Sequence, residues 1–324
     1  MPISTPLTAR LGIQHPILSA PMDVIAGARL TAAVSAAGGF GILGGGYGDE
    51  AWLRQETAKL AGASDPFGIG FITWSLEKQP ALLDIALEAR PRAIMLSFGD
   101  PKPFATRINS SGALLICQVQ TIEHTREAVA NDADVIVAQG AEGGGHGIAR
   151  GTFALVPAVV DIARGTPVAA AGGVADGRGL AAALMLGADG VLLGTRFYAS
   201  VEAAGFKSAK ERIVAASGDR TIRGILFDIA RRNVWPAPFA GRVLRNEFSE
   251  RWRGREAELM QHPEEAERFA KARTSGDFDT AAVIAGEVVD LIGDIPPAAE
   301  IVERITREAA TLLAGASNRY RASS

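Results

Sequence analysis

The segment Thr166–Phe197 constrains the fold of this chain more than any other. Two short apolar runs, Val168–Ala171 and Gly190–Leu193, end at the turns Gly172-Gly173 and Gly194-Thr195, with helical spacing between them. In (β/α)8 barrels, the turns after strands seven and eight commonly bind a phosphate through backbone N–H groups. Two ordinary turns of another α/β protein are the alternative. A count of the upstream elements distinguishes the two.

Apolar runs of strand length alternate with segments of helical character along the chain. The predicted strands are Pro16–Ala20, Phe40–Leu43, Phe67–Phe71, Ala93–Ser97, Leu114–Val119, Asp134–Ala138, Pro167–Ala171 and Gly190–Gly194. The predicted helices are Leu30–Ala37, Ala51–Leu60, Pro80–Ala89, Pro103–Ile108, Ile122–Ala130, Val156–Ala163 and Gly179–Leu186. This alternation predicts a parallel sheet, and eight units predict a closed (β/α)8 TIM barrel. The two glycine turns then follow strands seven and eight.

An open, doubly wound sheet is the alternative fold, because the fourth predicted helix is short and the first turn after a strand is long. A dinucleotide-binding sheet would place the motif G-x-G-x-x-G directly after its first strand. No such motif follows Pro16–Ala20. The closed barrel is therefore the preferred interpretation.

The composition indicates an enzyme that can fold without covalent cross-links. The chain has 324 residues, of which 48% are hydrophobic, and a net charge of −3. A chain of this length buries enough surface to fold without disulfides or a structural metal. Cys117 is the only cysteine, and its place in a predicted strand indicates a packed core thiol. Because no signal-peptide pattern and no membrane-length apolar run occurs, we expect a cytoplasmic protein without membrane contact.

The character of the chain changes after the last predicted strand. We expect the barrel at residues 1–202, a helical cap over its mouth at 203–279, and helices that return to the barrel at 280–324. Lys207–Arg255 is rich in arginine, but acidic residues interrupt it and no aromatic-basic stripe occurs, so we expect a solvated face rather than a nucleic-acid site. The two returning helices are predicted at Thr280–Ile292 and Ala298–Leu313.

The loop Ala138–Gly151 (AQGAEGGGHGIARG) follows the sixth predicted strand and carries the candidate catalytic residue. Its three consecutive glycines allow unusual backbone shapes and place His146 at the catalytic face of the barrel. A neutral imidazole there can remove a proton or hold an anion in place. Gln139 either faces the barrel mouth or stabilises the loop, and Glu142 is expected to cap the loop rather than act as a base. The remaining histidines, which we expect to have no chemical role, are His15, His124 and His262.

The chain lacks the residue patterns of metal or nucleophilic catalysis. It has no H-x-H or H-E-x-x-H, no G-x-S-x-G and no Cys/His pair. A barrel with a phosphate cradle and one histidine then needs a phosphorylated cofactor, either FMN or pyridoxal phosphate. Pyridoxal phosphate requires a lysine at a strand end, and no predicted barrel strand contains or directly precedes one. FMN is therefore the preferred cofactor, and no metal is expected.

Several segments together resemble one enzyme family. They are His15–Met22, Leu30–Gly46, Ala138–Gly147, Ala170–Phe197 and Ala285–Ile292. These segments are similar to those of the nitronate monooxygenases, formerly called 2-nitropropane dioxygenases, which are FMN-dependent (β/α)8 barrels. The resemblance implies that His146 is the active-site histidine. The cofactor-binding residues that we assign on this basis are Pro21, Met22, Gly70, Gln118, Gln139, Gly144, Gly172, Gly173, Leu192, Leu193, Gly194 and Thr195.

The resemblance implies different roles for different members of this set. Pro21 and Met22 would lie against the flavin, and Gly173 with Leu192–Thr195 would bind the phosphate through backbone groups. Gly70 is a departure, because many family members have asparagine there.

The resemblance implies FMN-dependent oxidation of alkyl nitronates by O2, which yields carbonyl compounds and nitrite. His146 would stabilise the anion or remove the α-proton of a neutral nitroalkane. One alternative is an NAD(P)H-dependent flavin reductase of enoyl-acyl-carrier-protein, other enoyl thioesters or quinones, served by the arginine-rich cap. A second alternative is a phosphate-binding barrel without flavin. A small-molecule substrate is the expected partner, and a homodimer is one oligomeric state that we consider.

Overall fold

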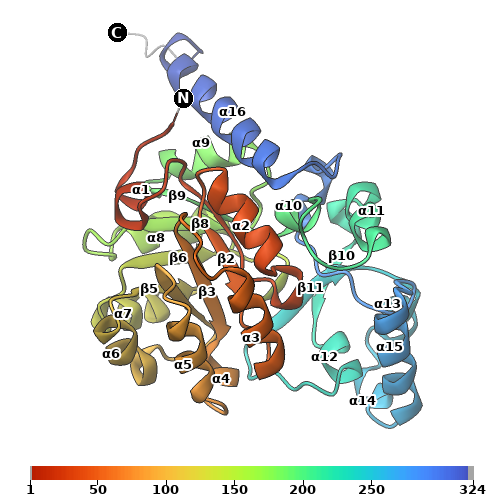
Figure 1. Cartoon of the computed structure of the whole chain (residues 1–324). Helices are drawn as coiled ribbons and strands as arrows, with labels where there is room; N and C mark the ends of the chain where they lie inside the picture. The colour runs from red at the N-terminus through yellow and green to blue at the C-terminus, as the bar shows by residue number, and fades with distance from the viewer. Residues whose placement is uncertain (1, 320–324) are drawn as a thin grey trace.

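The computed structural model describes residues 2–319, and eight parallel strands form its centre (Figure 1). The strands are β1 (Ile17–Ser19), β2 (Gly41–Gly44), β3 (Phe67–Ile72), β4 (Ala93–Ser97), β5 (Leu114–Val119), β6 (Val135–Gln139), β8 (Val168–Ala171) and β9 (Gly190–Leu193). Their order is β1-β9-β8-β6-β5-β4-β3-β2, so each strand lies beside its neighbour in sequence and the last lies beside the first.

The sheet closes on itself where β1 meets β2. Leu18 and Phe40 form a parallel bridge, and the Ser19 amide donates to the Phe40 carbonyl at 3.0 Å. The Ser19 hydroxyl also accepts a hydrogen bond from the Ile42 amide at 3.1 Å. The predicted (β/α)8 barrel is thus confirmed, and the open sheet is excluded.

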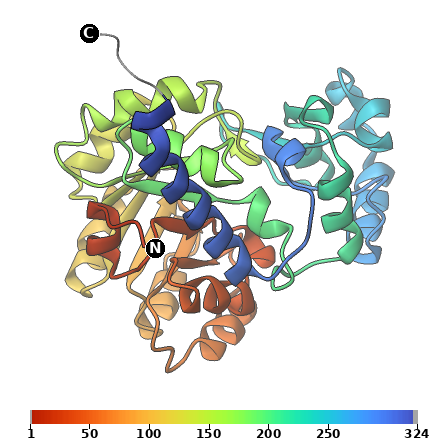
Figure 2. The same cartoon turned by 90° about the horizontal axis from the view of Figure 1, so that it is seen from above.

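Helices surround the barrel, mostly at the predicted places. They are α2 (Ala28–Ala36), α3 (Glu50–Lys59), α5 (Ala81–Glu88), α6 (Lys102–Ser110), α7 (Ile122–Ala130), α8 (Thr152–Val160) and α9 (Gly177–Met185), with the short α1 (Pro6–Leu11), α4 (Thr73–Leu76) and α10 (Thr195–Tyr198) at strand ends. The C-terminal helix α16 (Ala298–Arg319) packs against α9 and α2 and completes the ring (Figures 1 and 2). Residues 320–324 of the predicted last segment lie outside the described residues.

Alternate strand residues separate two layers of the core. Leu192 packs inside the barrel with Leu18 and Ile116, whereas Leu193 packs in the layer between the strands and the helices. This is the alternation expected of strands, whose successive side chains point to opposite faces. The interior layer is filled by side chains, so a ligand can bind only at an end of the barrel.

The cap contains more than helices. Its helices are α11 (Lys207–Ala215), α12 (Leu226–Ala230), α13 (Glu247–Trp252), α14 (Glu256–Leu259) and α15 (Pro263–Ser275), and they gather on one side of the barrel in both views (Figures 1 and 2). Between them, β10 (Thr221–Gly224) and β11 (Ala240–Leu244) form an antiparallel sheet with β7 (Gly145–Gly147), which carries His146.

The cap is therefore not formed by helices alone. The strands β10 and β11 are short and arginine-containing. They form because β11 pairs with β7 of residues 140–147, which we call the glycine loop, at least 93 positions earlier in the chain, and β10 pairs with β11. Such a distant pairing leaves no local apolar periodicity, which is the signal that sequence reasoning uses.

The predicted helix at Thr280–Ile292 is also wrong. Residues 281–286, which we call the strap, have no regular secondary structure, and only Glu287–Leu291 form a 3-10 helix. The Leu244 amide donates to the Val283 carbonyl at 2.9 Å, and the Glu287 amide donates to the Glu142 carbonyl at 2.9 Å. The strap thus satisfies its backbone on β11 and the glycine loop, which replaces the hydrogen bonds of a helix.

Within residues 2–319, no helix is both long enough and apolar enough to cross a membrane.

Candidate active site

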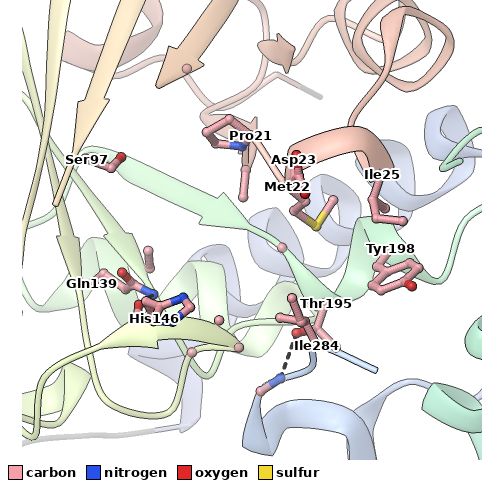
Figure 3. Close-up of a pocket in the computed structure, with 18 of the residues that line it drawn as sticks. Pro21, Met22, Asp23, Ile25, Ser97, Gln139, His146, Thr195, Tyr198 and Ile284 are labelled. Carbon is pink, nitrogen blue, oxygen red and sulfur yellow. Dashed lines mark hydrogen bonds between the residues drawn. The ribbon is translucent and has the colours of Figure 1, made fainter. Parts of the chain in front are cut away.

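A cavity of about 340 Å³ lies at the carboxyl ends of the barrel strands. Its volume falls in the range of small-molecule and cofactor sites. Pro21, Gln139 and His146 border it from different strands, while the strap contributes Ile284 (Figure 3). The predicted site residues that line it are Pro21, Met22, Gly70, Gln118, Gln139, Gly144, His146, Gly172, Gly173, Leu192, Gly194 and Thr195.

Leu193 is the predicted site residue that does not line this cavity. Its side chain belongs to the layer between strands and helices, and its carbonyl accepts a hydrogen bond from the Ala20 amide at 2.9 Å. The alternation of side chains along β9 explains why Leu192 faces the cavity while Leu193 faces away.

The two glycine turns present backbone donors at the cavity wall. Gly172 and Gly173 have φ values of +91° and +75°, a region that favours glycine. The N–H groups of these two residues, and those of Gly194 and Thr195, donate to no acceptor within residues 2–319. Four unpaired donors in the wall of one cavity fit an anionic oxygen-rich group, such as a phosphate.

Gly70 makes room for Pro21. A Cβ atom at position 70 would lie 2.5 Å from both Cβ and Cγ of Pro21, which is closer than real contacts allow. A larger residue here would therefore displace Pro21 from the cavity wall. The position of Pro21 thus gives a local physical reason for glycine at position 70, where the sequence resemblance led us to expect asparagine.

The glycine loop is packed directly against the strap. A Cβ atom at Gly144 would lie 2.7 Å from both the Ala285 carbonyl carbon and the Gly286 nitrogen. The Gly286 amide in turn donates to the Thr195 hydroxyl at 3.0 Å (dashed line in Figure 3). The strap therefore ties the loop after β6 to the turn after β9, and both border the cavity.

Arg223 of β10 holds the carbonyl groups of the glycine loop. Its guanidinium donates to the carbonyl oxygens of Ala141 at 2.8 Å, Gly143 at 3.1 Å and Ala240 at 2.5 Å. Burial, with a smaller contribution from nearby Arg242, lowers the pKa of Arg223 to about 10. Part of the arginine-rich cap thus has a structural role toward the active-site loop.

His146 forms a buried pair with Asp228 of α12. Its Nε2 lies 3.0 Å from both carboxylate oxygens, and the two residues are only 8% and 6% exposed. The imidazole also stacks on the Trp235 indole, with ring centroids 3.4 Å apart and planes 6° from parallel. Both partners come from the cap, which therefore orients the histidine supplied by the loop.

The environment of His146 favours its neutral form. Burial lowers the pKa of His146, and this effect outweighs the opposing effect of the hydrogen bond that His146 donates to Asp228. Because an ionised carboxylate only accepts hydrogen bonds, Nε2 carries the proton. Nδ1 has no hydrogen-bond partner among residues 2–319, so it is the nitrogen free to accept a proton.

Aromatic side chains enclose the histidine. The Trp235 indole N–H donates to the Tyr47 hydroxyl at 3.2 Å, and Phe98 packs edge-on against Trp235 with ring centroids 5.0 Å apart. Burial raises the pKa of Tyr47. Phe98 also has a φ of +65°, a conformation that is uncommon for an aromatic residue. These rings keep water away from one side of the imidazole.

A chain of side-chain amides connects the strand ends to the glycine loop. The Ser97 hydroxyl donates to Gln118 Oε1 at 3.2 Å, and Gln118 in turn donates to Gln139 Oε1. Gln139 Nε2 donates to the His146 carbonyl at 3.3 Å. Gln139 thus both lines the cavity and supports the loop, so the two interpretations of this residue are compatible.

Arg231 and Arg273 bring positive charge to the cavity wall. The Arg273 guanidinium lies 3.8 Å from the carboxylate of Asp23, and the Arg231 guanidinium lies over the Tyr47 ring at 5.8 Å. Burial, followed by the proximity of Arg231, lowers the pKa of Arg273.

Other residues weighed from the sequence have structural places. The Glu142 carboxylate accepts hydrogen bonds from the Thr152 amide at 2.9 Å and hydroxyl at 2.8 Å, so it caps the start of α8. This contact explains why α8 begins four residues before the predicted helix. Burial raises the pKa of the Cys117 thiol to about 12, which makes it a poor nucleophile. The other three histidines do not line the cavity.

Sequence reasoning missed Asp228, Trp235 and Ile284. Asp228 lies in an otherwise apolar helix, LFDIA, and an ionisable residue in such a run is a usable signal because burial requires a partner. Trp235 lies in a proline-rich aromatic loop that gave no positional information. No group of three or more His, Cys, Asp or Glu that could hold a metal ion occurs in the described part of the chain.

The chain is a (β/α)8 barrel whose cavity combines the unpaired donors of two glycine turns with a buried His–Asp pair. This combination of fold and site is typical of an enzyme. The family model for nitronate monooxygenase matches residues 4–81 and 76–308. The chain therefore belongs to the nitronate monooxygenase family and is an oxidoreductase.

Several known proteins are similar to the chain over nearly its whole length. The chain is 37% identical to the nitronate monooxygenase npaC of Metarhizium robertsii, covering 92% of this chain and 91% of that protein. It is 30% identical to an indene-carboxyl-CoA dehydrogenase of Mycobacterium tuberculosis, covering 98% and 99% of the two chains. The solved structure of FabK from Thermotoga maritima has a TM-score of 0.86 and 32% identity, covering 98% of this chain and all of that one.

Proposed function

We propose that this protein is an FMN-dependent oxidoreductase that uses O2 to convert alkyl nitronates into carbonyl compounds and nitrite. The observation that carries the proposal is the His146–Asp228 pair in the wall of the cavity that also presents the glycine-turn donors. Membership of the nitronate monooxygenase family supports the reaction type.

The cavity residues fit a phosphorylated flavin. The unpaired N–H groups of Gly172, Gly173, Gly194 and Thr195 would bind its phosphate, because they are donors without protein acceptors. Pro21 and Met22, together with the side-chain amides of Gln118 and Gln139, would border its ring system. When bound, FMN would supply the capacity to accept electrons from the substrate and to pass them to O2.

His146 would manage the proton and the charge of the substrate. With Nε2–H donating to Asp228, Nδ1 is available to remove the α-proton of a neutral nitroalkane. The imidazolium formed in this way would be stabilised by the Asp228 carboxylate on one side and by the anionic nitro group on the other. If the substrate binds as a preformed nitronate, His146 would instead be protonated at Nδ1, and this N–H group would donate a hydrogen bond to a nitro oxygen.

The enclosure around His146 would strengthen these interactions. Trp235, Phe98 and Tyr47 surround the imidazole and lower the local dielectric constant, which increases the attraction between opposite charges. We also propose that residues 203–279 act as the cap of the site, because Arg231, Trp235 and Arg273 reach the cavity from this segment.

Aerobic turnover tests the proposed reaction. The protein is loaded with FMN and mixed with ethyl nitronate or propyl-2-nitronate, and nitrite, carbonyl product and O2 uptake are measured together. We expect nitrite and carbonyl product in equal amounts, with O2 consumed. Absence of nitrite from every nitronate offered to the flavin-loaded protein would contradict the proposal.

A flavin-dependent oxidoreductase of thioester substrates is the second candidate. Similarity to the CoA-thioester dehydrogenase over nearly the whole chain favours it. Arg231 and Arg273 in the cavity wall would suit a phosphate-bearing substrate. Rapid oxidation of NADH or NADPH in the presence of an enoyl thioester, without turnover of nitronates, would favour this candidate.

A further inference from the structure

A second cavity, of about 360 Å³, lies behind the wall of the catalytic cavity. The strap and the residues before it separate the two. Ala282 and Ile284 line the catalytic cavity, whereas Val283 between them lines the second one, and Phe278 borders both. The second cavity therefore has a size similar to that of the first, but its own set of wall residues.

The second cavity is strongly basic. Arg212, Arg220 and Arg245 line it, and within the described residues no acidic side chain does. Arg212 is paired with Asp279 at 2.6 Å, but the guanidiniums of Arg220 and Arg245 donate to no acceptor within residues 2–319. Nε of Arg245 is moreover buried without a hydrogen-bond partner. Unused guanidinium donors around a cavity are suited to phosphate oxygens.

The nearby carboxylates have other partners. The Asp290 carboxylate accepts a hydrogen bond from the Gly218 amide at 2.9 Å, and Glu287 pairs with Arg242 at 2.8 Å. Arg220, which is exposed, and Arg245, which is half-buried, form no ion pair within the residues that the structure describes. A bound anion would supply the missing partner.

Apart from the polar residues Ser217 and Asn246, the remaining wall is apolar. Leu244, Phe278 and Val283 form it, together with two alanines at the end of α11, Ala215 and Ala216. A cavity with guanidiniums on one side and apolar groups on the other suits an organic molecule that carries a phosphate, better than it suits a bare inorganic ion. We propose that this second cavity binds a phosphorylated organic molecule of the nucleoside phosphate class, independently of the flavin site.

Calorimetric titration with ADP tests the proposal. The protein is saturated with FMN, and inorganic pyrophosphate, adenosine and sodium chloride of matched ionic strength are titrated in parallel. We expect saturable binding of one ADP per chain, weaker binding of pyrophosphate, and no saturation with the salt. Absence of saturable ADP binding, or displacement of ADP by additional FMN, would overturn the proposal.

Variants locate the binding. The double variant R220Q/R245Q keeps polar side chains but removes both charges, and we expect it to weaken ADP binding by about tenfold or more. The control R54Q/R126Q removes two exposed arginines elsewhere, each paired only with glutamates, and should bind ADP like the wild type. Equal losses in both double variants would overturn the proposal. If R220Q/R245Q does not fold, as judged by circular dichroism, the single variants R220Q and R245Q provide the same comparison.

Discussion

The imidazole of His146 and the carboxylate of Asp228 meet across 82 positions of sequence, with Nε2 of the histidine 3.0 Å from both carboxylate oxygens. The histidine comes from the glycine loop after a barrel strand, and the aspartate comes from the cap. The cap therefore supplies a buried charged partner to the histidine and is more than a passive cover. The contact also determines which imidazole nitrogen is available to a ligand. Nδ1 is available, because Nε2 is hydrogen-bonded to Asp228.

Replacing Asp228 by asparagine should impair catalysis through His146. We expect kcat/KM for the oxidation of a neutral nitroalkane, in which His146 acts as the base, to fall by on the order of 10²–10⁴. Asp228 raises the pKa of His146, so its removal should also move the acid limb of the pH–rate profile to lower pH. The readout is the complete pH profile of D228N beside the surface control D161N. A reduced rate with an unmoved acid limb would contradict the proposed role of Asp228.

The stability of the fold should depend on pH through His146. Burial lowers its pKa below the ordinary value of 6.5, so the unfolded chain binds a proton more readily than the native protein. The free energy of unfolding should therefore decrease as the pH falls below 6.5, until the lowered native pKa is reached. Urea titrations of the wild type and H146Q at several pH values measure this. The decrease should be smaller in H146Q, and parallel curves for the two proteins would refute the prediction.

Gly70→Ala should disturb the cavity wall through Pro21. The added Cβ would lie 2.5 Å from two atoms of Pro21, and we expect a loss of about 1–3 kcal/mol of stability together with weaker FMN binding. Gly293→Ala is the matched control, because a Cβ there meets no atom within 4 Å. Thermal unfolding and fluorescence titration with FMN provide the readouts. Identical behaviour of both variants would show that the Gly70–Pro21 contact is unimportant.

Arg223→Met should loosen the glycine loop. The substitution removes the donors to the carbonyls of Ala141 and Gly143 and leaves these oxygens with fewer partners. We expect lower kcat/KM and faster cleavage by trypsin at Arg150, which follows the loop. Arg126→Met, at an exposed arginine of α7, is the control. Unchanged cleavage at Arg150 would argue against a clamp by Arg223.

The barrel could be predicted from the sequence because its signals are local. Runs such as Ala93–Leu96 and Leu114–Cys117 are apolar along their whole length, and their side chains pack in both layers of the core. The glycine turns were equally visible, since Gly172 and Gly173 adopt backbone conformations that other residues rarely tolerate. The run of glycines directly before His146 is a local signal of the same kind, and it predicted that this residue lies at the carboxyl ends of the strands.

The partners of His146 were not predictable in this way. Asp228 and Trp235 lie between β10 and β11 in the chain, and the sheet in which β10 pairs with β11 and β11 pairs with β7 brings them to His146. No periodicity within these strands indicates that pairing. The strap failed as a predicted helix for a related reason. Its apolar composition suits a helix, but Val283 and Gly286 find backbone or side-chain partners elsewhere in the fold.

Oxidation of nitronates by this chain is proposed to require a bound flavin. The most direct test mixes the FMN-loaded protein anaerobically with propionate 3-nitronate, and separately with NADH and NADPH, while flavin absorbance is followed in a stopped-flow instrument. We expect rapid bleaching by the nitronate and slow or no bleaching by either nicotinamide. Rapid bleaching by a nicotinamide with no response to the nitronate would contradict this proposal and identify a reductase.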